Sequence, residues 1–167
     1  VGEAIRESGI PRDQVFVTTK LANSDHGFER AQEAFQESLQ RLGMEYVDLF
    51  LIHWPIPGRV DSWKAFERIA KEGKARSIGV SNFTIDFLEE LSRETQVVPA
   101  VNQVEFHPFL VQPDLLQYCK DNGIQLEAYS PLVRAQRFDH PTIQTLAKKH
   151  GKTPAQILIR WDLQHQV

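Results

Sequence analysis

Residues 46–55 read Tyr-Val-Asp-Leu-Phe-Leu-Ile-His-Trp-Pro. The run is apolar until it reaches His53 and Trp54, so it predicts a buried strand, Tyr46–His53, that ends in chemically active side chains. A shorter stretch upstream, Val15–Lys20, has the same form and ends in Lys20. In a parallel α/β sheet or barrel, side chains at the carboxyl ends of strands face the place where ligands bind. Lysine and histidine can donate protons or polarise an oxygen at such a place.

Strand and helix patterns alternate along the whole chain. Three further strands are expected over Ala75–Ser81, Ala100–Glu105 and Ile124–Tyr129. Apolar spacings of three and four and helix-end signals predict helices over Val1–Ser8, Phe28–Leu42, Asp61–Lys71, Ile85–Ser92, Pro113–Cys119, Pro141–His150 and Pro154–Gln164. Strands recur at roughly the period of a βα unit, which predicts a parallel sheet covered on both faces. An open doubly wound sheet and an eight-stranded barrel both fit this period. No Gly-x-Gly-x-x-Gly follows any strand, which weakens the dinucleotide-binding open sheet.

Composition narrows the class of protein. The chain has 167 residues, 41% hydrophobic and 25% charged, which is typical of a globular domain with a real core. Its net charge of -3 and the lack of a basic cluster disfavour nucleic acid as a partner. The single cysteine, Cys119, rules out an intrachain disulfide and fits a reducing compartment. No apolar run has the length of a membrane span, and no signal peptide is recognisable, so we expect a cytoplasmic protein.

Six short runs carry a resemblance to one family. They are Val-Thr-Thr-Lys ending at Lys20, Tyr46–Pro55, Ile78–Phe83, Pro99–Pro108, Tyr129–Leu132 and His150–Gln156. In this order and spacing the chain resembles the aldo-keto reductase family over its whole length. The resemblance implies an eight-stranded βα barrel, of TIM type, that uses a nicotinamide cofactor without a Rossmann domain. It implies that the chain, residues 1–167, is a single incomplete barrel domain. The five strands would be the third to seventh, with the first two and the last absent.

The resemblance also implies a reaction and residues for it. Family members reduce aldehydes or ketones to alcohols by hydride transfer, usually from NADPH, and NADH is left open here. Lys20 matches the lysine that lowers the pKa of a catalytic tyrosine, and His53 matches the histidine that orients and polarises the carbonyl group. Trp54 matches an aromatic wall of the substrate pocket. The family's tyrosine and its aspartate belong before the position of Val1, and neither is in this chain.

Cofactor-binding positions follow from the same runs. Ser81, Asn82 and Gln103 match residues that hold the nicotinamide carboxamide, whose donor and acceptor suit amide and hydroxyl partners. Tyr129 matches the aromatic residue that stacks on the nicotinamide ring. Ser130 and Leu132 match the loop near the pyrophosphate. Val133 stands where relatives often have glycine, so the close backbone approach that glycine allows is in question. The final strand that grips the adenosine 2′-phosphate has no counterpart here.

Three functions remain open at this point. The chain is part of a working carbonyl reductase, or a truncated and inactive cofactor-binding module, or a barrel fragment with a structural role. The first is favoured by the presence of all six matching strand-end residues, which are Lys20, His53, Ser81, Asn82, Gln103 and Tyr129. We expect a small-molecule carbonyl substrate, a monomeric parent protein and a fragment that self-associates through its open edges. The histidines show no ligand-pair spacing, so no metal site is expected. The runs at residues 8–13 and 23–27 look most like small microbial reductases, including those acting on 2,5-diketogluconate.

Overall fold

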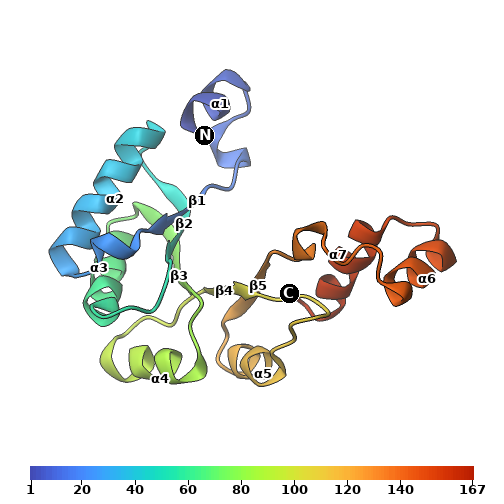
Figure 1. Ribbon diagram of the computed structural model, residues 1–167. Helices are drawn as coiled ribbons and strands as arrows, with labels where there is room; N and C mark the ends of the chain where they lie inside the picture. The colour runs from blue at the N-terminus through green and yellow to red at the C-terminus, as the bar shows by residue number, and fades with distance from the viewer. The chain divides into compact units, whose positions relative to one another are not determined.

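The computed structural model describes residues 1–167 and shows alternating strands and helices. The chain divides into two compact units, Val1–Val101 and Asn102–Val167 (Figure 1).

In the first unit, β1 (Thr18–Leu21), β2 (Val47–Ile52) and β3 (Ala75–Ser81) pair in parallel and in this order. The register sets Lys20 opposite Leu51, and Ile52 opposite Val80. Because parallel strands point the same way, their carboxyl ends meet at one edge of this sheet. That edge carries Lys20 and the residues that follow β2 and β3.

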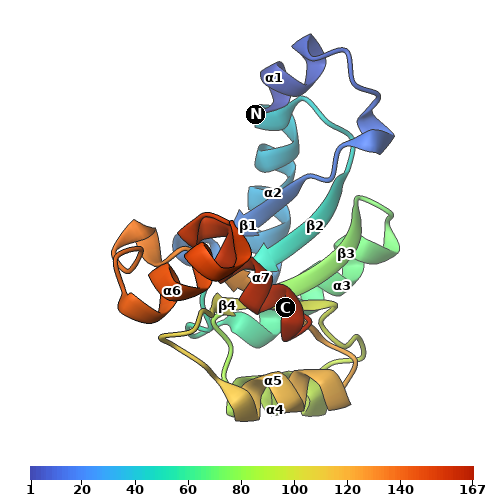
Figure 2. The same cartoon turned by 90° about the vertical axis from the view of Figure 1, so that its right-hand side faces the viewer.

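The helices of the first unit are α1 (Gly2–Glu7), α2 (Phe28–Leu42), α3 (Arg59–Lys71) and α4 (Ile85–Glu94), with 3-10 helices η1 (Arg12–Gln14) and η2 (Asn23–Asp25). Figures 1 and 2 show α2 and α3 on the same side of the three strands. The core between these layers is aromatic. The ring of Phe50 in β2 lies 4.7 Å from that of Phe35 in α2 and 4.0 Å from that of Phe66 in α3. This packing holds the strands against the helices.

A buried carboxylate joins the opposite, amino ends of the strands. Asp48 accepts hydrogen bonds from the backbone N–H of Val17 at 2.9 Å, from Arg12 at 2.8 Å and from Arg76 at 3.1 Å. Burial by itself would raise the pKa of Asp48, but these bonds and the two guanidinium charges hold it below the ordinary value. Both guanidinium groups also lie over the ring of Tyr46, each at 4.2 Å from its centre.

The second unit contains β4 (Val101–Glu105), which begins at the boundary, and β5 (Gln125–Tyr129), its neighbour in the sheet. Its helices are α5 (Pro113–Asp121), η3 (Val133–Ala135), α6 (Pro141–His150) and α7 (Pro154–Gln164). α5 packs on β5, and α6 packs on α7. α7 opens with a capping box between Thr153 and Gln156, with Pro154 at the first helical position.

All five expected strands are present, with some shifted bounds. β1 begins at Thr18 rather than Val15, because η1 and an extended link precede it. Tyr46 lies outside β2, between the two arginines. α3 begins at Arg59 rather than Asp61, since Gly58 adopts a left-handed conformation with φ 86° and ends the preceding loop. None of the helices combines the length and the apolar character that crossing a membrane requires.

Candidate functional site

Four of the predicted site residues gather at the carboxyl edge of the first unit's sheet. Lys20 lies in β1, His53 directly follows β2, Ser81 ends β3 and Asn82 follows it. The register brings these strand ends side by side. The side chain of Ser81 is fully buried, whereas His53 is exposed. The edge therefore offers a cation, an imidazole, a hydroxyl and an amide within one small region.

His53 carries its proton less readily than an ordinary histidine. Partial removal of water from its ring lowers the pKa of His53, and the positive charge of Lys20 lowers it further. Both effects disfavour the imidazolium, so the neutral ring dominates at neutral pH. A neutral imidazole has one N–H, which can donate a hydrogen bond to an oxygen acceptor.

Asn82 secures the backbone beside this histidine. Its Nδ2 donates to the carbonyl oxygen of His53 at 3.0 Å and lies 3.2 Å from Oγ of Ser81. Asn82 has φ 63°, in the left-handed region that asparagine tolerates better than most residues. Its amide therefore links the end of β3 to the end of β2.

Trp54 stands beside His53 and is 42% exposed. The two rings are 6.2 Å apart and tilted by 36°. An exposed aromatic surface next to a neutral imidazole suits one wall of a small-molecule pocket.

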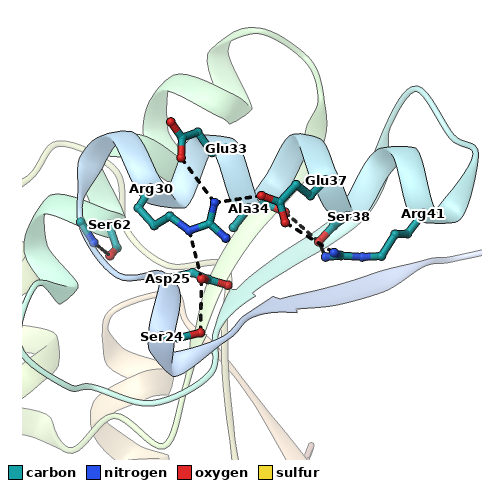
Figure 3. Close-up of polar contacts among 10 residues, drawn as sticks. Ser24, Asp25, Arg30, Glu33, Ala34, Glu37, Ser38, Arg41 and Ser62 are labelled. Atoms are coloured by element: carbon teal, nitrogen blue, oxygen red, sulfur yellow. Dashed lines mark hydrogen bonds and ion pairs between the residues drawn. The ribbon is translucent and has the colours of Figure 1, made fainter.

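The loop after Lys20 is held by α2. Asp25 accepts a hydrogen bond from Nε of Arg30 at 3.1 Å and from Oγ of Ser24 at 3.2 Å (Figure 3). Where α2 begins, the N–H of Gly27 donates to Oγ of Ser62 in α3 at 2.9 Å. These contacts fix the path of the chain immediately beyond β1.

The remaining predicted residues lie in the second unit. Gln103 is in the middle of β4 rather than at its end, and its Nε2 donates to Glu127 of β5 at 2.6 Å. Tyr129 ends β5 and is partly buried. Loss of water and the nearby charge of Glu105 raise the pKa of Tyr129, so its phenol stays protonated at neutral pH.

The loop after β5 has an unusual backbone. Ser130 has φ 52°, and φ is positive again at Val133, Arg134 and Ala135. The N–H of Val133 donates to the carbonyl of Ser130 at 2.9 Å, and Leu132 lies within the turn so formed. A β-branched residue in the left-handed region is strained, so Val133 occupies a conformation that glycine would adopt more easily.

Sequence reasoning missed Arg59, whose side chain ties the loop after His53 to α4. Its partner Glu90 lies 31 positions away, and no local pattern marks such a pair. No group of three or more His, Cys, Asp or Glu side chains is placed to hold a metal ion.

The first unit consists of parallel βα segments, and one carboxyl edge of its sheet carries a lysine, an imidazole and an amide. This arrangement is typical of βα proteins that bind their ligands at the carboxyl ends of the strands. The model of the aldo/keto reductase family matches residues 1–167. The chain belongs to this family.

Curated relatives share about half of its residues. A glyoxal reductase of Bacillus subtilis is 51% identical over 168 residues, which cover 100% of this chain and 61% of the relative. A 9,11-endoperoxide prostaglandin H2 reductase of Trypanosoma cruzi is 48% identical over 171 residues, covering 100% of this chain and 60% of that protein. The chain thus spans about 60% of the length of these relatives.

Solved structures agree closely with the fold. An aldo-keto reductase from a deep-sea metagenome library is 46% identical with a TM-score of 0.97, over 100% of this chain and 63% of that one. A putative 2,5-diketo-D-gluconic acid reductase B is 38% identical with a TM-score of 0.95, and the match covers 99% of this chain and 60% of that one. A Bombyx mori aldo-keto reductase solved with NADP is 37% identical with a TM-score of 0.92, over 99% and 62%.

Proposed function

We propose that the protein reduces small aldehydes or ketones to alcohols with a nicotinamide cofactor. The observation that carries the proposal is that Lys20 and His53 lie at the ends of neighbouring strands, at the carboxyl edge of one sheet. The relatives named as reductases support it. We further propose that the five strands correspond to the third to seventh of an eight-stranded barrel. On this proposal the family's tyrosine and aspartate come from sequence outside the chain.

The residues present suit a nicotinamide cofactor. Amide and hydroxyl groups can bond both the donor and the acceptor of a carboxamide, and an aromatic side chain can lie against a flat ring. We assign Ser81, Asn82 and Gln103 to the carboxamide, Tyr129 to the ring, and Ser130 and Leu132 to the phosphates. When bound, the cofactor supplies the hydride that reduces the carbonyl carbon. NADPH is the cofactor we favour, because solved relatives contain NADP or NADPH.

The chain's own residues would act on the carbonyl oxygen. His53, in its neutral form, donates a hydrogen bond that orients the carbonyl and stabilises the charge that develops on its oxygen. The ammonium group of Lys20 favours the ionised form of a neighbouring phenol and so brings its pKa closer to neutral pH. Trp54 contributes apolar surface beside the oxygen-binding group.

The thiol of Cys119 is buried and forms no disulfide, which suits a cytoplasmic location for the protein.

Two substitutions test this function. Lys20→Met and His53→Ala should each lower kcat/KM for a small aldehyde such as glyoxal by about 100-fold or more, since each removes a group from the oxygen-stabilising set. The assay follows oxidation of NADPH. Lys64→Met on the exposed face of α3 is the matched control and should retain the parent rate. Near-parent rates in the two site variants would refute the assignment.

The intact mass of the protein from its source tests the barrel proposal. A complete barrel needs a mass of roughly 30 kDa. A mass near 19.2 kDa would instead favour the inactive or structural module.

A further inference from the structure

The loop that carries His53 and Trp54 is held at both ends by one neighbouring segment. At its start, Asn82 donates to the carbonyl of His53. At its end stands Arg59, the first residue of α3, whose side chain bonds Glu90 of α4. Asn82 and Glu90 both belong to the stretch that follows β3. The six residues from 53 to 58, here termed the His53 loop, are thus clamped between two contacts to the same segment.

The contact at Arg59 is well built. Its Nε lies 2.5 Å and its Nη2 2.8 Å from the two carboxylate oxygens of Glu90. The guanidinium also lies 4.5 Å from the centre of the Phe87 ring. The side chain of Arg59 is only 19% exposed. A two-point charged bond over an aromatic face fixes direction as well as distance, which lysine cannot reproduce.

The side chain of Arg59 also contacts the His53 loop directly. Nη1 of Arg59 donates to the carbonyl of Pro55 at 3.4 Å. The backbone continues the link. The N–H of Arg59 donates to the carbonyl oxygen of Ile56 at 3.2 Å, and the N–H of Ile56 donates to the carbonyl oxygen of Trp54 at 2.9 Å. A shift of the Arg59 side chain would therefore be passed to Trp54 within two turns.

The loop has little freedom on its other side. A Cβ added at Gly58 would lie 3.4 Å from Cβ of His26, so the loop after β1 packs against the His53 loop at this glycine. Since Gly58 also has φ 86°, no other residue fits the position without strain. The His53 loop is therefore confined by packing at Gly58 and directed by the bonds of Arg59.

We propose that Arg59, acting through Glu90 and Phe87, is a positioning residue that fixes the His53 loop and so determines which carbonyl compounds fit beside His53. The proposal rests on the proposed reductase function. Arg59 is not a catalytic residue, because its bonds are to the loop and to α4. Its effect is on the place of Trp54, the apolar wall, and hence on the size of substrate that is accepted.

The first test measures the loop itself and needs no enzymatic activity. Trp161, and any tryptophan outside residues 1–167, is first replaced by phenylalanine, so that the remaining indoles are Trp54, 42% exposed, and the fully buried Trp63. Acrylamide quenching then reports on Trp54. Arg59→Met should raise the quenching constant about twofold, as the indole moves from partial to full exposure. Arg59→Lys should raise it as well, because the two-point bond is lost while the charge remains.

The same helix supplies a matched control. Arg68 and Glu72 form an exposed pair four positions apart in α3, at 3.1 Å. Arg68→Met should leave Trp54 quenching at the parent value. The exchanged pair, Arg59→Glu with Glu90→Arg, should return quenching toward the parent value, which a general loss of stability would not do. If Arg59→Met and Arg68→Met give the same quenching, the proposal is overturned.

The second test measures selectivity. The ratio of kcat/KM for benzaldehyde to that for propanal should change about tenfold in Arg59→Met, with kcat for propanal nearly kept. An equal loss for both aldehydes would overturn the role in selectivity. If the parent protein reduces no carbonyl compound, the proposed function fails, whereas the quenching comparison still decides whether Arg59 fixes the loop.

Discussion

The side-chain amide of Asn82 donates a hydrogen bond to the backbone carbonyl of His53, with 3.0 Å between nitrogen and oxygen. The bond joins the ends of β2 and β3 and requires a left-handed residue directly after β3. Asparagine satisfies both demands, since it tolerates this conformation and carries the amide.

Two substitutions at Asn82 separate these demands. Asn82→Gly removes the amide but accepts φ 63°, whereas Asn82→Ala removes the amide and resists this φ. We expect Asn82→Ala to lower the free energy of unfolding by about 1 kcal/mol more than Asn82→Gly. Denaturant unfolding measures both. Equal losses would show that the conformation at residue 82 is not imposed by the fold.

The pKa of His53 should respond to Lys20. The charge of Lys20 disfavours the imidazolium, so Lys20→Met should raise the pKa of His53. The pKa should remain below its ordinary value, because loss of water from the ring, the larger cause, is unchanged. An NMR titration identifies the His53 signal by its absence in His53→Ala. A pKa that does not move in Lys20→Met would place the ammonium group too far away to act.

Asp162 in α7 should make stability depend on pH. Both of its carboxyl oxygens are buried without a hydrogen-bond partner, and burial raises the pKa of Asp162 to about 6, against the opposing charges of His107 and His165. The folded chain therefore keeps this proton at a pH where the unfolded chain has released it. The contribution of Asp162 to the free energy of unfolding is fully present below about pH 4. It is lost as pH rises through about 6, by roughly 3 kcal/mol in total.

Asp162→Asn tests this dependence because it cannot ionise. Relative to the parent, the variant should gain stability between pH 4 and pH 7.5, as measured by thermal melting at each pH. Asp114→Asn, at an exposed aspartate of α5, is the control and should show no such gain. A constant difference between Asp162→Asn and the parent at all pH values would contradict the assignment.

Val133→Gly should relieve strain. A left-handed conformation costs a β-branched residue about 1–2 kcal/mol, and glycine gives back part of the gain through its freer unfolded state. We therefore expect a small net rise in the free energy of unfolding, of at most about 1 kcal/mol. Val98→Gly, at an exposed valine without positive φ, should instead lower it. A loss of stability in both variants would contradict the strain argument.

The 167-residue chain should self-associate when it is made alone. β1 is an edge strand, and large apolar side chains are exposed, among them Val98, Ile159 and Leu163. Unpaired strand edges and apolar surface favour pairing between copies. Light scattering after gel filtration should give a mass above 19.2 kDa, and Leu163→Lys should lower it. A monomer with one cooperative melting transition would contradict this expectation.

Much of this protein could be predicted because the signals are local. The run that ends in His53 predicts a buried strand with a polar end, and β2 is buried throughout. Thr153, Pro154 and Gln156 lie within four residues of one another, so the start of α7 needs no distant information. The bounds of predicted strands shifted where side chains from distant segments make contacts. Tyr46, for example, lies outside β2, and two arginines from other segments lie over its ring.

The amino-acid sequence by itself determined the alternation of strands and helices, the strand ends that carry Lys20 and His53, and the family. Each depends on patterns within a few residues or on short runs in order. Only the tertiary structure decided that Asn82 bonds His53 and that Arg59 bonds Glu90. It also decided that Asp162 is buried without a partner. These depend on which side chains meet after folding, because hydrogen bonds and burial join residues that no local spacing relates.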